Sequence, residues 1–271
     1  MVRSNRMVRL TMAINRRTTW KLLLLSAVVS LLVLAGTLLL QAGRVAMHHA
    51  ATCNRLEQIE LAIKCYYSEN GRYPPQYLTD RQGMLAHSWR ILILKYIDID
   101  LYRRYSFDEP WNGPHNRLLA SEMPEIYRSP FVGPRSTVTQ YVGISGKETP
   151  WRGTTPLRDQ DMRSNVSEFA PDYVPLIWFV EVANSDINWM EPRDIPFEQA
   201  VAGINLPEGR GIQSNYTDGL PAQMKPFGCE WVPVDISPEK LRLMLTVAEQ
   251  GKKGSVQRPL TTDETAKQPP P

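Results

Sequence analysis

The fold of this chain is decided by the stretch WKLLLLSAVVSLLVLAGTLLLQ, residues 20–41. Its one charged side chain is Lys21, at its start. A helix of this length measures roughly 33 Å, which is enough to cross the hydrocarbon core of a bilayer, about 30 Å thick. Backbone amides in lipid must find their partners within their own segment, so such a stretch is helical there. The sequence therefore predicts a transmembrane helix over residues 20–41.

The net charge of +3 conceals an asymmetry between the N-terminus and the rest of the chain. Residues 1–21 contain six Lys or Arg and no acid, whereas the other 250 residues contain 25 bases and 28 acids. By the positive-inside rule, this predicts a single-pass protein of the inner (cytoplasmic) membrane, with a cytoplasmic N-terminus and a periplasmic C-terminal domain. Because the excess of basic residues is confined to residues 1–21, membrane lipid is an expected partner of the chain and nucleic acid is not.

A cleavable signal peptide is the alternative interpretation of the apolar stretch. Its length argues against this, because the apolar region of a signal peptide is typically about 7–15 residues long. The alanine-rich residues 44–51 still offer a cleavage site. Whether the N-terminus is processed therefore stays open at the level of sequence.

Composition divides the chain into four segments. Residues 1–18 are expected to be a disordered basic cytoplasmic lead, followed by the membrane helix at 20–41. Residues 44–250 are expected to form one extracytoplasmic domain, and the polar, proline-ended residues 252–271 a disordered tail.

Beyond the membrane, the helix is predicted to continue to Asn70. Asn70-Gly71 is a typical helix stop, and Pro74-Pro75 prevents a restart. Apolar residues at spacings of three and four mark one packing face of this amphipathic part, while its charged residues fall mostly elsewhere. The predicted packing face consists of Cys53, Leu56, Ile59, Ile63 and Tyr66, and the charged residues are Arg55, Glu57, Glu60 and Lys64.

The rest of the domain is predicted from shorter patterns. Leu85–Tyr105 has helical periodicity, and residues 106–133 are broken by prolines into an irregular tract. Strands are predicted at Thr137–Val142, Val174–Val182 and Glu230–Val234, of which the second has the composition of a buried central strand. Ser237-Pro238 predicts the start of a last helix that stops at Gly251.

Five blocks of sequence, in order along the chain, resemble one known family. The blocks are Cys53–Pro75, Ser88–Leu119, Met123–Pro130, Val180–Glu198 and Val234–Thr246. They resemble the planctomycetal prepilin-like family of unknown function, whose bacterial members are membrane-anchored, are often grouped with type II secretion or type IV pilin relatives, and also carry a solute-binding label. The resemblance implies an α+β, pilin-like fold: a long N-terminal helix packed on a small antiparallel sheet, here with irregular insertions.

The chain departs from that family in three places. No acid lies between Met1 and Arg44, so the glutamate of a prepilin peptidase site, and the glycine-led run that carries it, are missing before the membrane helix. Ser129 stands where the family often has a cysteine, which implies the loss of one disulfide. A glycine-rich segment near the family's C-terminus is replaced by Pro221–Trp231. These departures indicate a diverged member.

The three cysteines leave the disulfide pattern open. Cys53 and Cys65 lie on one predicted helix about 18 Å apart, too far to be bonded to each other. Cys229 can pair with one of them in an oxidising compartment, or all three can be small buried apolar residues.

Acidic and aromatic clusters are the candidate binding residues. Carboxylates flanking a tryptophan are suited to binding or hydrolysing a sugar, and such a cluster contains Glu181, Asp186, Glu191 and Asp194 beside Trp189. The candidate ligand-binding residues are Trp89, Tyr96, Trp111, Glu181, Trp189 and Glu191. The alternative is that the aromatic side chains belong to the hydrophobic core.

Metal and catalytic signatures are weak by comparison. Asp98, Asp100, Asp108 and Glu109 are oxygen ligands of the kind calcium prefers, but their spacing fits no EF-hand loop. The usual nucleophile, phosphate-binding and redox motifs are absent. We therefore expect no cofactor, no metal and no enzymatic activity.

Two functional hypotheses remain. The first is a membrane-anchored, pseudopilin-like structural subunit that binds other proteins in the membrane or periplasm. The second is a membrane-tethered module that binds a carbohydrate or a peptide.

Overall fold

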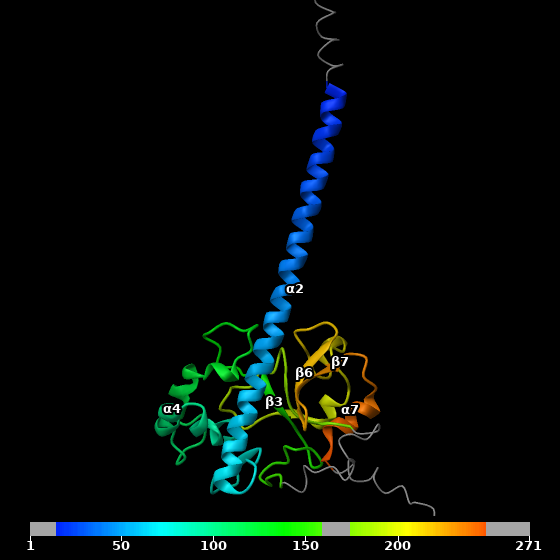
Figure 1. The fold of residues 1–271 in the computed structure, drawn as a ribbon. Coiled ribbons are helices and arrows are strands. Elements are labelled where there is room, and N and C mark those ends of the chain that lie inside the picture. Colours follow the sequence, from blue (N-terminus) through cyan, green and yellow to red (C-terminus); the bar gives the residue numbers. More distant parts are fainter. Residues whose placement is uncertain (1–14, 159–173, 248–271) are drawn as a thin grey trace, which may run out of the picture. The chain divides into compact units, whose positions relative to one another are not determined.

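The computed structural model describes residues 15–158 and 174–247 (Figure 1). The expected basic lead, apart from its last residues, and the expected tail at 252–271 lie outside the described residues. The chain divides into two compact units, residues 1–50 and 51–271.

The described part of the first unit belongs to helix α2 (Asn15–Asn70). Helix α2 begins before the expected start at residue 20, because residues 15–19 contain no proline or glycine to stop it. The Leu and Val side chains between Leu22 and Leu40 are between 51% and 74% exposed. By its length and composition α2 could cross a membrane, and it is the one such helix in residues 15–158 and 174–247.

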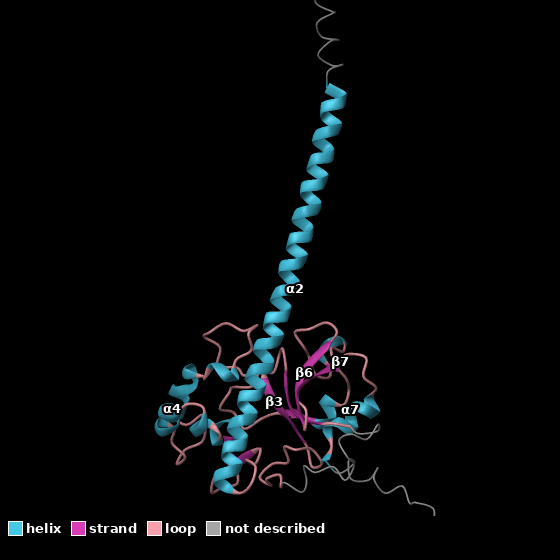
Figure 2. Ribbon diagram, viewed as in Figure 1, coloured by secondary structure: helices cyan, strands magenta, loops and turns pink. Residues whose placement is uncertain are grey.

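The second unit is α+β with two sheets, and its strands are linked by extensive loops (Figure 2). The larger sheet has the strand order β5-β3-β4-β6-β7, and the smaller pairs β1 with β2. The strands are β1 (Tyr77–Thr79), β2 (Leu85–Ser88), β3 (Tyr141–Ser145), β4 (Leu176–Glu181), β5 (Ile195–Pro196), β6 (Gly219–Lys225) and β7 (Gly228–Pro233). Pairing is antiparallel except that β3 and β5 are parallel, so the expectation of one small antiparallel sheet needs correction.

Short helices lie between these strands and after the last of them. The α-helices are α3 (Trp89–Leu92), α4 (Ile99–Arg104), α6 (Phe197–Ala200) and α7 (Pro238–Leu245). The 3₁₀ helices are η1 (Leu94–Tyr96), η2 (Asn116–Glu122), η3 (Glu125–Tyr127) and η4 (Pro207–Gly209). The tract at 106–133 is irregular as predicted, because it contains two short 3₁₀ helices and no strand.

The prediction of one helix over Leu85–Tyr105 is wrong. Its first four residues form β2 and pair with β1, and the remainder divides into α3, η1 and α4. Asp98 accounts for one of the breaks, because its carboxylate accepts a hydrogen bond from the backbone N–H of Leu101 at 2.9 Å and caps a new helix. Local side-chain capping therefore overrides the helical periodicity there.

Composition predicted the central strand better than the others. All six residues of β4 are buried, as its apolar, aromatic sequence indicates. The structure shifts the first predicted strand to Tyr141–Ser145 and the last to Gly228–Pro233. Strand β6 was not predicted, because Gly219 and Pro221 weaken its strand signal, although Pro221 pairs with Trp231. Helix α7 starts as predicted with Ser237 as its cap, and ends at Leu245 rather than Gly251.

The five-stranded sheet lies between two apolar clusters. Leu56, Ile59 and Ile63 of α2 belong to one cluster together with Trp178 and Phe179, two consecutive residues of β4. A register irregularity between Ile177 and Phe179 explains why two neighbours join the same cluster. The other cluster contains alternate residues of β3 and β6, Ile177 and Val180 on either side of the irregularity in β4, and the apolar side of α7. Residues 51–70 of α2 and helix α7 therefore belong to opposite clusters.

Covalent and polar contacts join residues 51–70 of α2 to the sheet. Cys53 forms a disulfide with Cys229 on β7, with their Cα atoms 5.4 Å apart. Thr52 donates a hydrogen bond to Glu181 on β4 at 3.3 Å. Glu60 is 7% exposed and forms an ion pair with Lys225 on β6, so it is an exception among the charged residues predicted to fall mostly off the packing face.

Candidate functional site

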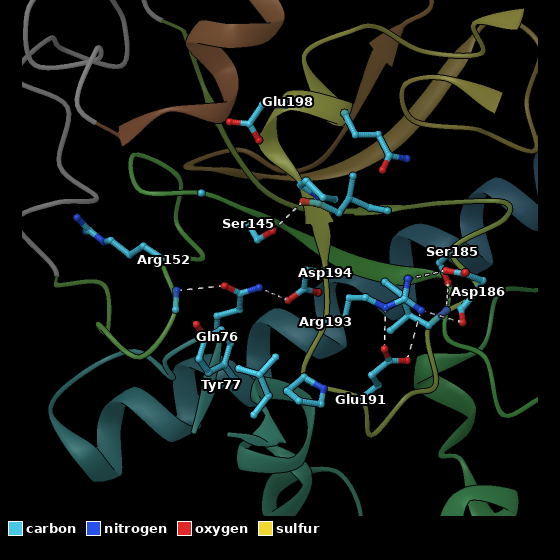
Figure 3. Close-up of a pocket in the computed structure, with 18 of the residues that line it drawn as sticks. Gln76, Tyr77, Ser145, Arg152, Ser185, Asp186, Glu191, Arg193, Asp194 and Glu198 are labelled. Atoms are coloured by element: carbon cyan, nitrogen blue, oxygen red, sulfur yellow. Dashed lines mark hydrogen bonds and ion pairs between the residues drawn. The ribbon is translucent and has the colours of Figure 1, made fainter. Parts of the chain in front are cut away.

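The candidate site is an open pocket of about 990 Å³ in the second unit (Figure 3). Tyr77 of β1 and Leu85 of β2 line one side, and Ile195 and Pro196 of the edge strand β5 line another. Other lining residues are Gln76, Trp111, Ser145 to Lys147, Arg152, Gly153, Ser185 to Ile187, Glu191 to Asp194, Glu198 and Gln199. The pocket thus lies between the two sheets and combines segments far apart in the sequence.

Asp194 anchors the floor of the pocket. It is 4% exposed, and its Oδ1 accepts hydrogen bonds from Nη2 of Arg90 at 2.6 Å and from the backbone N–H of Gly143 at 2.9 Å. The indole N–H of Trp89 also donates to Oδ1, and the amide of Gln76 donates to Oδ2, each at 3.3 Å. Arg90 is itself fully buried, so this ion pair is shielded from water and fixes the floor in one geometry.

The loop that faces β1 is held by two hydrogen bonds between Gln76 and Gly153. The N–H of Gln76 donates to the carbonyl of Gly153 at 2.9 Å, and the N–H of Gly153 donates to the side-chain oxygen of Gln76 at 3.1 Å. Gly153 has φ +72, and a Cβ there would lie 3.1 Å from the hydroxyl of Tyr77. The positive φ favours glycine here, and a larger residue would also crowd the Tyr77 hydroxyl.

Arg193 forms the charged rim of the pocket (Figure 3). Its Nε donates to Glu191 at 2.7 Å and its Nη1 donates to Asp186 at 2.9 Å. The pKa of the Arg193 guanidinium is raised. The main cause is its hydrogen bond with Glu191, and the charge of Asp186 adds to it. The two carboxylates thus share one guanidinium at the surface, and the group keeps one net negative charge.

The pocket includes three of the four carboxylates that the sequence groups beside Trp189. Asp186 and Glu191 pair with Arg193, and Asp194 pairs with Arg90. Each of these three carboxylates therefore accepts a hydrogen bond from an arginine. Carboxylates held in this way can act as fixed hydrogen-bond acceptors in the wall of a ligand-binding pocket.

The six candidate ligand-binding residues divide between the pocket and the interior. Trp111 and Glu191 line the pocket. Tyr96 lies in a smaller pocket of about 410 Å³ beside α2. Trp89 and Trp189 are fully buried, and Glu181 is 2% exposed. Trp89 stacks on Trp151 at 4.6 Å and Trp189 on Tyr127 at 5.9 Å, so both belong to the core.

Several pocket residues were not singled out as binding residues from the sequence. Gln76, Tyr77, Ser145 and Arg152 enter the pocket through pairing between distant segments. A clue was available at residues 191–196, where acids, an arginine and two prolines follow one another closely. That density of polar and turn-forming residues is typical of a functional loop.

The predicted packing face of α2 is well defined in the structure. Leu56, Ile59 and Ile63 are fully buried, and Cys53 is in the disulfide. Tyr66 is partly buried and contacts Tyr96 edge to face at 6.5 Å. Burial by itself would raise the pKa of Glu60, but the hydrogen bonds and charges of Lys225 and then Lys64 hold it below its usual value.

Within residues 15–158 and 174–247, no three His, Cys, Asp or Glu side chains are grouped so as to hold a metal ion. Three of the acids weighed as calcium ligands have other partners in the structure. Asp98 caps α4, and Glu109 accepts a hydrogen bond from the backbone N–H of His115 at 2.9 Å. Asp100 pairs with Arg103 at 3.2 Å.

Comparison with known proteins adds one match. The family model SBP_bac_10, described as a protein of unknown function (DUF1559), matches residues 41–170. No curated protein and no solved structure matches the chain. The matched region is just under half of the chain and includes the blocks from Cys53 to Pro130, but not Val180–Glu198 or Val234–Thr246. The chain is therefore similar to a family of unknown function over the pocket side formed by Gln76, Tyr77 and Trp111.

Proposed function

We propose that the chain is a single-pass inner-membrane protein whose C-terminal domain lies in the periplasm and binds other proteins there. The observation that carries this proposal is the run of exposed apolar side chains from Leu22 to Leu40, preceded by basic residues with no acid. Exposed leucine and valine in such density are unfavourable in water and favourable in lipid. The Cys53–Cys229 disulfide supports an oxidising compartment for the domain.

In its finer form, the proposal is a pseudopilin-like structural subunit, linked to a type II secretion or type IV pilus-like system. Support comes from residues 51–70 of α2, whose apolar face packs on one side of a sheet. An interaction role is also supported by Leu61, which is 61% exposed on α2 and lines the smaller pocket with Ile97 and Ile126. We propose no catalytic activity for this subunit.

Site-specific photo-crosslinking tests the interaction role. A photoreactive amino acid replaces Leu61 in the full chain, expressed in its native membrane, with Phe227 as the matched exposed apolar control. We expect a crosslinked species of discrete mass at Leu61, containing a second copy of this chain or a pilin-like or secretion component, and none at Phe227. A domain that yields no crosslink from Leu61, or the same pattern from both positions, contradicts the proposal.

The pocket supports a second candidate function, a membrane-tethered module that binds a carbohydrate or a peptide. Its volume of about 990 Å³ is at the upper end of the range typical of ligand sites, roughly 300–1,000 Å³. Its floor is preorganised by the Arg90–Asp194 pair. Thermal unfolding of the full chain with oligosaccharides and peptides tests it, because a ligand that binds the folded state raises the melting temperature.

A further inference from the structure

The large pocket is one part of a longer groove. A neighbouring pocket of about 690 Å³ shares Gly146, Lys147 and Glu198 with it. The second pocket continues to Phe197 of α6 and Arg242 of α7. A continuous surface from Trp111 to Arg242 is suited to an extended ligand rather than a small compact one.

Charges along the larger pocket are balanced. Its walls carry the bases Lys147, Arg152 and Arg193 and the acids Asp186, Glu191, Asp194 and Glu198. The buried Arg90 beneath Asp194 supplies the fourth positive charge. When the buried Arg90 is counted against Asp194, the positive and negative groups in and beneath the pocket are equal in number. The pocket then has no excess of either sign for an anionic or cationic ligand.

The charges that line the neighbouring pocket also balance. It contains Lys147 and Arg242 against Glu148 and Glu198. The guanidinium of Arg242 lies over the ring of Phe197, 5.2 Å from its centroid. The charges summed over both pockets and Arg90 cancel, so the groove has no net charge that would favour phosphates, nucleotides or uronic acids.

Aromatic and amide side chains complete the lining. Tyr77 and Trp111 lie in the larger pocket and Phe197 in the smaller, while Gln76 and Gln199 contribute amides. Aromatic rings pack against the apolar C–H faces of pyranose rings, and amides and arginine-paired carboxylates can bond to neighbouring hydroxyls. The two pockets together thus supply aromatic rings for the apolar faces of a sugar chain and fixed polar groups for its hydroxyls.

We propose that this groove binds a neutral oligosaccharide of several sugar units, with Trp111 and Tyr77 at one end and Phe197 at the other. The inference rests on the second candidate function and specifies its ligand. Peptides are the other class that such a groove admits. They are less suited to it because the edge strand β5 has only two residues, one of them Pro196, which cannot donate a backbone hydrogen bond.

Matched sugars test the charge and length requirements. Titration calorimetry of the full chain in lipid nanodiscs uses neutral chitopentaose against its de-acetylated cationic counterpart, and neutral cellopentaose against an anionic galacturonate pentamer. Shorter members of each neutral series and a neutral alanine–serine peptide complete the panel. We expect one neutral series to bind, with affinity rising with chain length. Tighter binding of either charged oligomer, or binding of no sugar in the panel, overturns the inference.

Variants locate the ligand within the groove. Trp111→Ala is expected to weaken binding roughly tenfold or more at every chain length, as loss of about 1.4 kcal/mol of contact does. Phe197→Ala is expected to weaken only the longer sugars. Trp111→Phe should recover most of the affinity, and Phe227→Ala, an exposed aromatic outside both pockets, should change nothing. Melting temperatures within the wild-type range are required of each variant.

The outcomes distinguish this inference from the function on which it rests. Peptide binding that Trp111→Ala abolishes would retain the pocket as a ligand site and reject the sugar. Sugar binding that is unaffected by both Trp111→Ala and Phe197→Ala would reject the groove. Absence of binding by every sugar and the peptide, with all variants folded, rejects the binding-module function together with its ligand.

Discussion

The buried charged residues Arg90 and Asp194 hold the core and the pocket together. The Arg90–Asp194 pair is almost completely hidden from water, and Asp194 also accepts hydrogen bonds from Gly143, Trp89 and Gln76. A buried pair of this kind contributes little net stability compared with apolar packing, but losing one partner leaves the other charge stranded. Asp194 is therefore a fixed point for both the core and the pocket.

Asp194→Asn tests this dependence. Asparagine keeps the shape and removes the charge, so the fully buried Arg90 loses its counter-ion. We expect the free energy of unfolding to fall by about 3–5 kcal/mol, measured by urea unfolding of the detergent-solubilised chain. Asp186→Asn is the matched control. Its side chain is 77% exposed, so we expect a loss below about 1 kcal/mol. Equal effects of the two changes would contradict a special role for the buried pair.

Glu181 gives the domain a pH dependence of opposite sign to that of Glu60. Burial is the main influence and raises the pKa of Glu181, while hydrogen bonds from Ser129 and Thr52 and the charge of Arg55 oppose it. The folded protein then binds the proton of Glu181 more tightly than the unfolded chain. Stability from this group decreases as the pH rises from the unfolded value near 4.5 through the raised pKa.

Glu181→Gln is accordingly expected to be more stable than the wild type at neutral pH, with the difference disappearing below the unfolded pKa. Glu60→Gln is the contrasting variant. Because the pKa of Glu60 is lowered, this change should destabilise at neutral pH, and its effect should shrink as the pH falls through the lowered pKa. Urea unfolding from neutral to acidic pH measures both. If both variants changed the free energy of unfolding in the same direction at neutral pH, the opposite pKa shifts of Glu181 and Glu60 would be refuted.

At the scale of elements, the disulfide links the amphipathic part of α2 to β7. Cys53 and Cys229 are 176 residues apart in sequence, so the bond restricts a long loop in the unfolded chain. Loops of this length give the larger stabilisations, about 2–5 kcal/mol. The link also keeps residues 51–70 of α2 against the sheet when other contacts loosen.

Cys229→Ser is therefore expected to lower the free energy of unfolding by about 2–5 kcal/mol. Cys65→Ser provides the control, because Cys65 is a free, exposed cysteine. Chemical denaturation under non-reducing conditions compares them, and a reducing agent should lower the wild type to the level of Cys229→Ser without changing that variant. Equal stability of the two serine variants would show that the bond contributes nothing.

Elements with strong local signals could be predicted from the sequence. The buried face of α2 follows from apolar spacing, the central strand β4 from its composition, and the start of α7 from Ser237-Pro238. Leu85–Tyr105 was misassigned because pairing of β2 with β1 is a non-local contact that periodicity cannot reveal. Strand β6 depends on neighbouring strands in the same way.

The candidate site was only partly predictable for the same reason. Trp111 and Glu191 line the pocket, whereas Trp89 and Trp189 are core, and composition does not separate a buried tryptophan from an exposed one. Glu60 shows the converse. A charged residue on an amphipathic helix is usually solvated, but Lys225, far along the chain, provides its partner.

At the scale of the whole molecule, the first unit is expected to be the anchor. Leu32→Arg combined with Val33→Arg places two charges at the centre of the apolar run, where each costs about 2.5–3.5 kcal/mol of insertion. We expect the variant to leave the membrane fraction or be degraded. Leu61→Arg is the matched control, because Leu61 is equally exposed but lies in the second unit. Unchanged membrane retention of the double variant would contradict an anchor.

Orientation is the last requirement of the proposed function, and Cys65 reports on it directly. It is exposed in the second unit, while Cys53 and Cys229 are bonded to each other, so a thiol reagent has one target among the three cysteines. A membrane-impermeant maleimide should label the chain in spheroplasts, where the periplasmic face is open, and should not label Cys65→Ser. Inside-out vesicles should resist labelling until detergent is added. Because six basic residues precede the apolar run, the opposite pattern would mean that the positive-inside rule fails here and that the domain faces the cytoplasm.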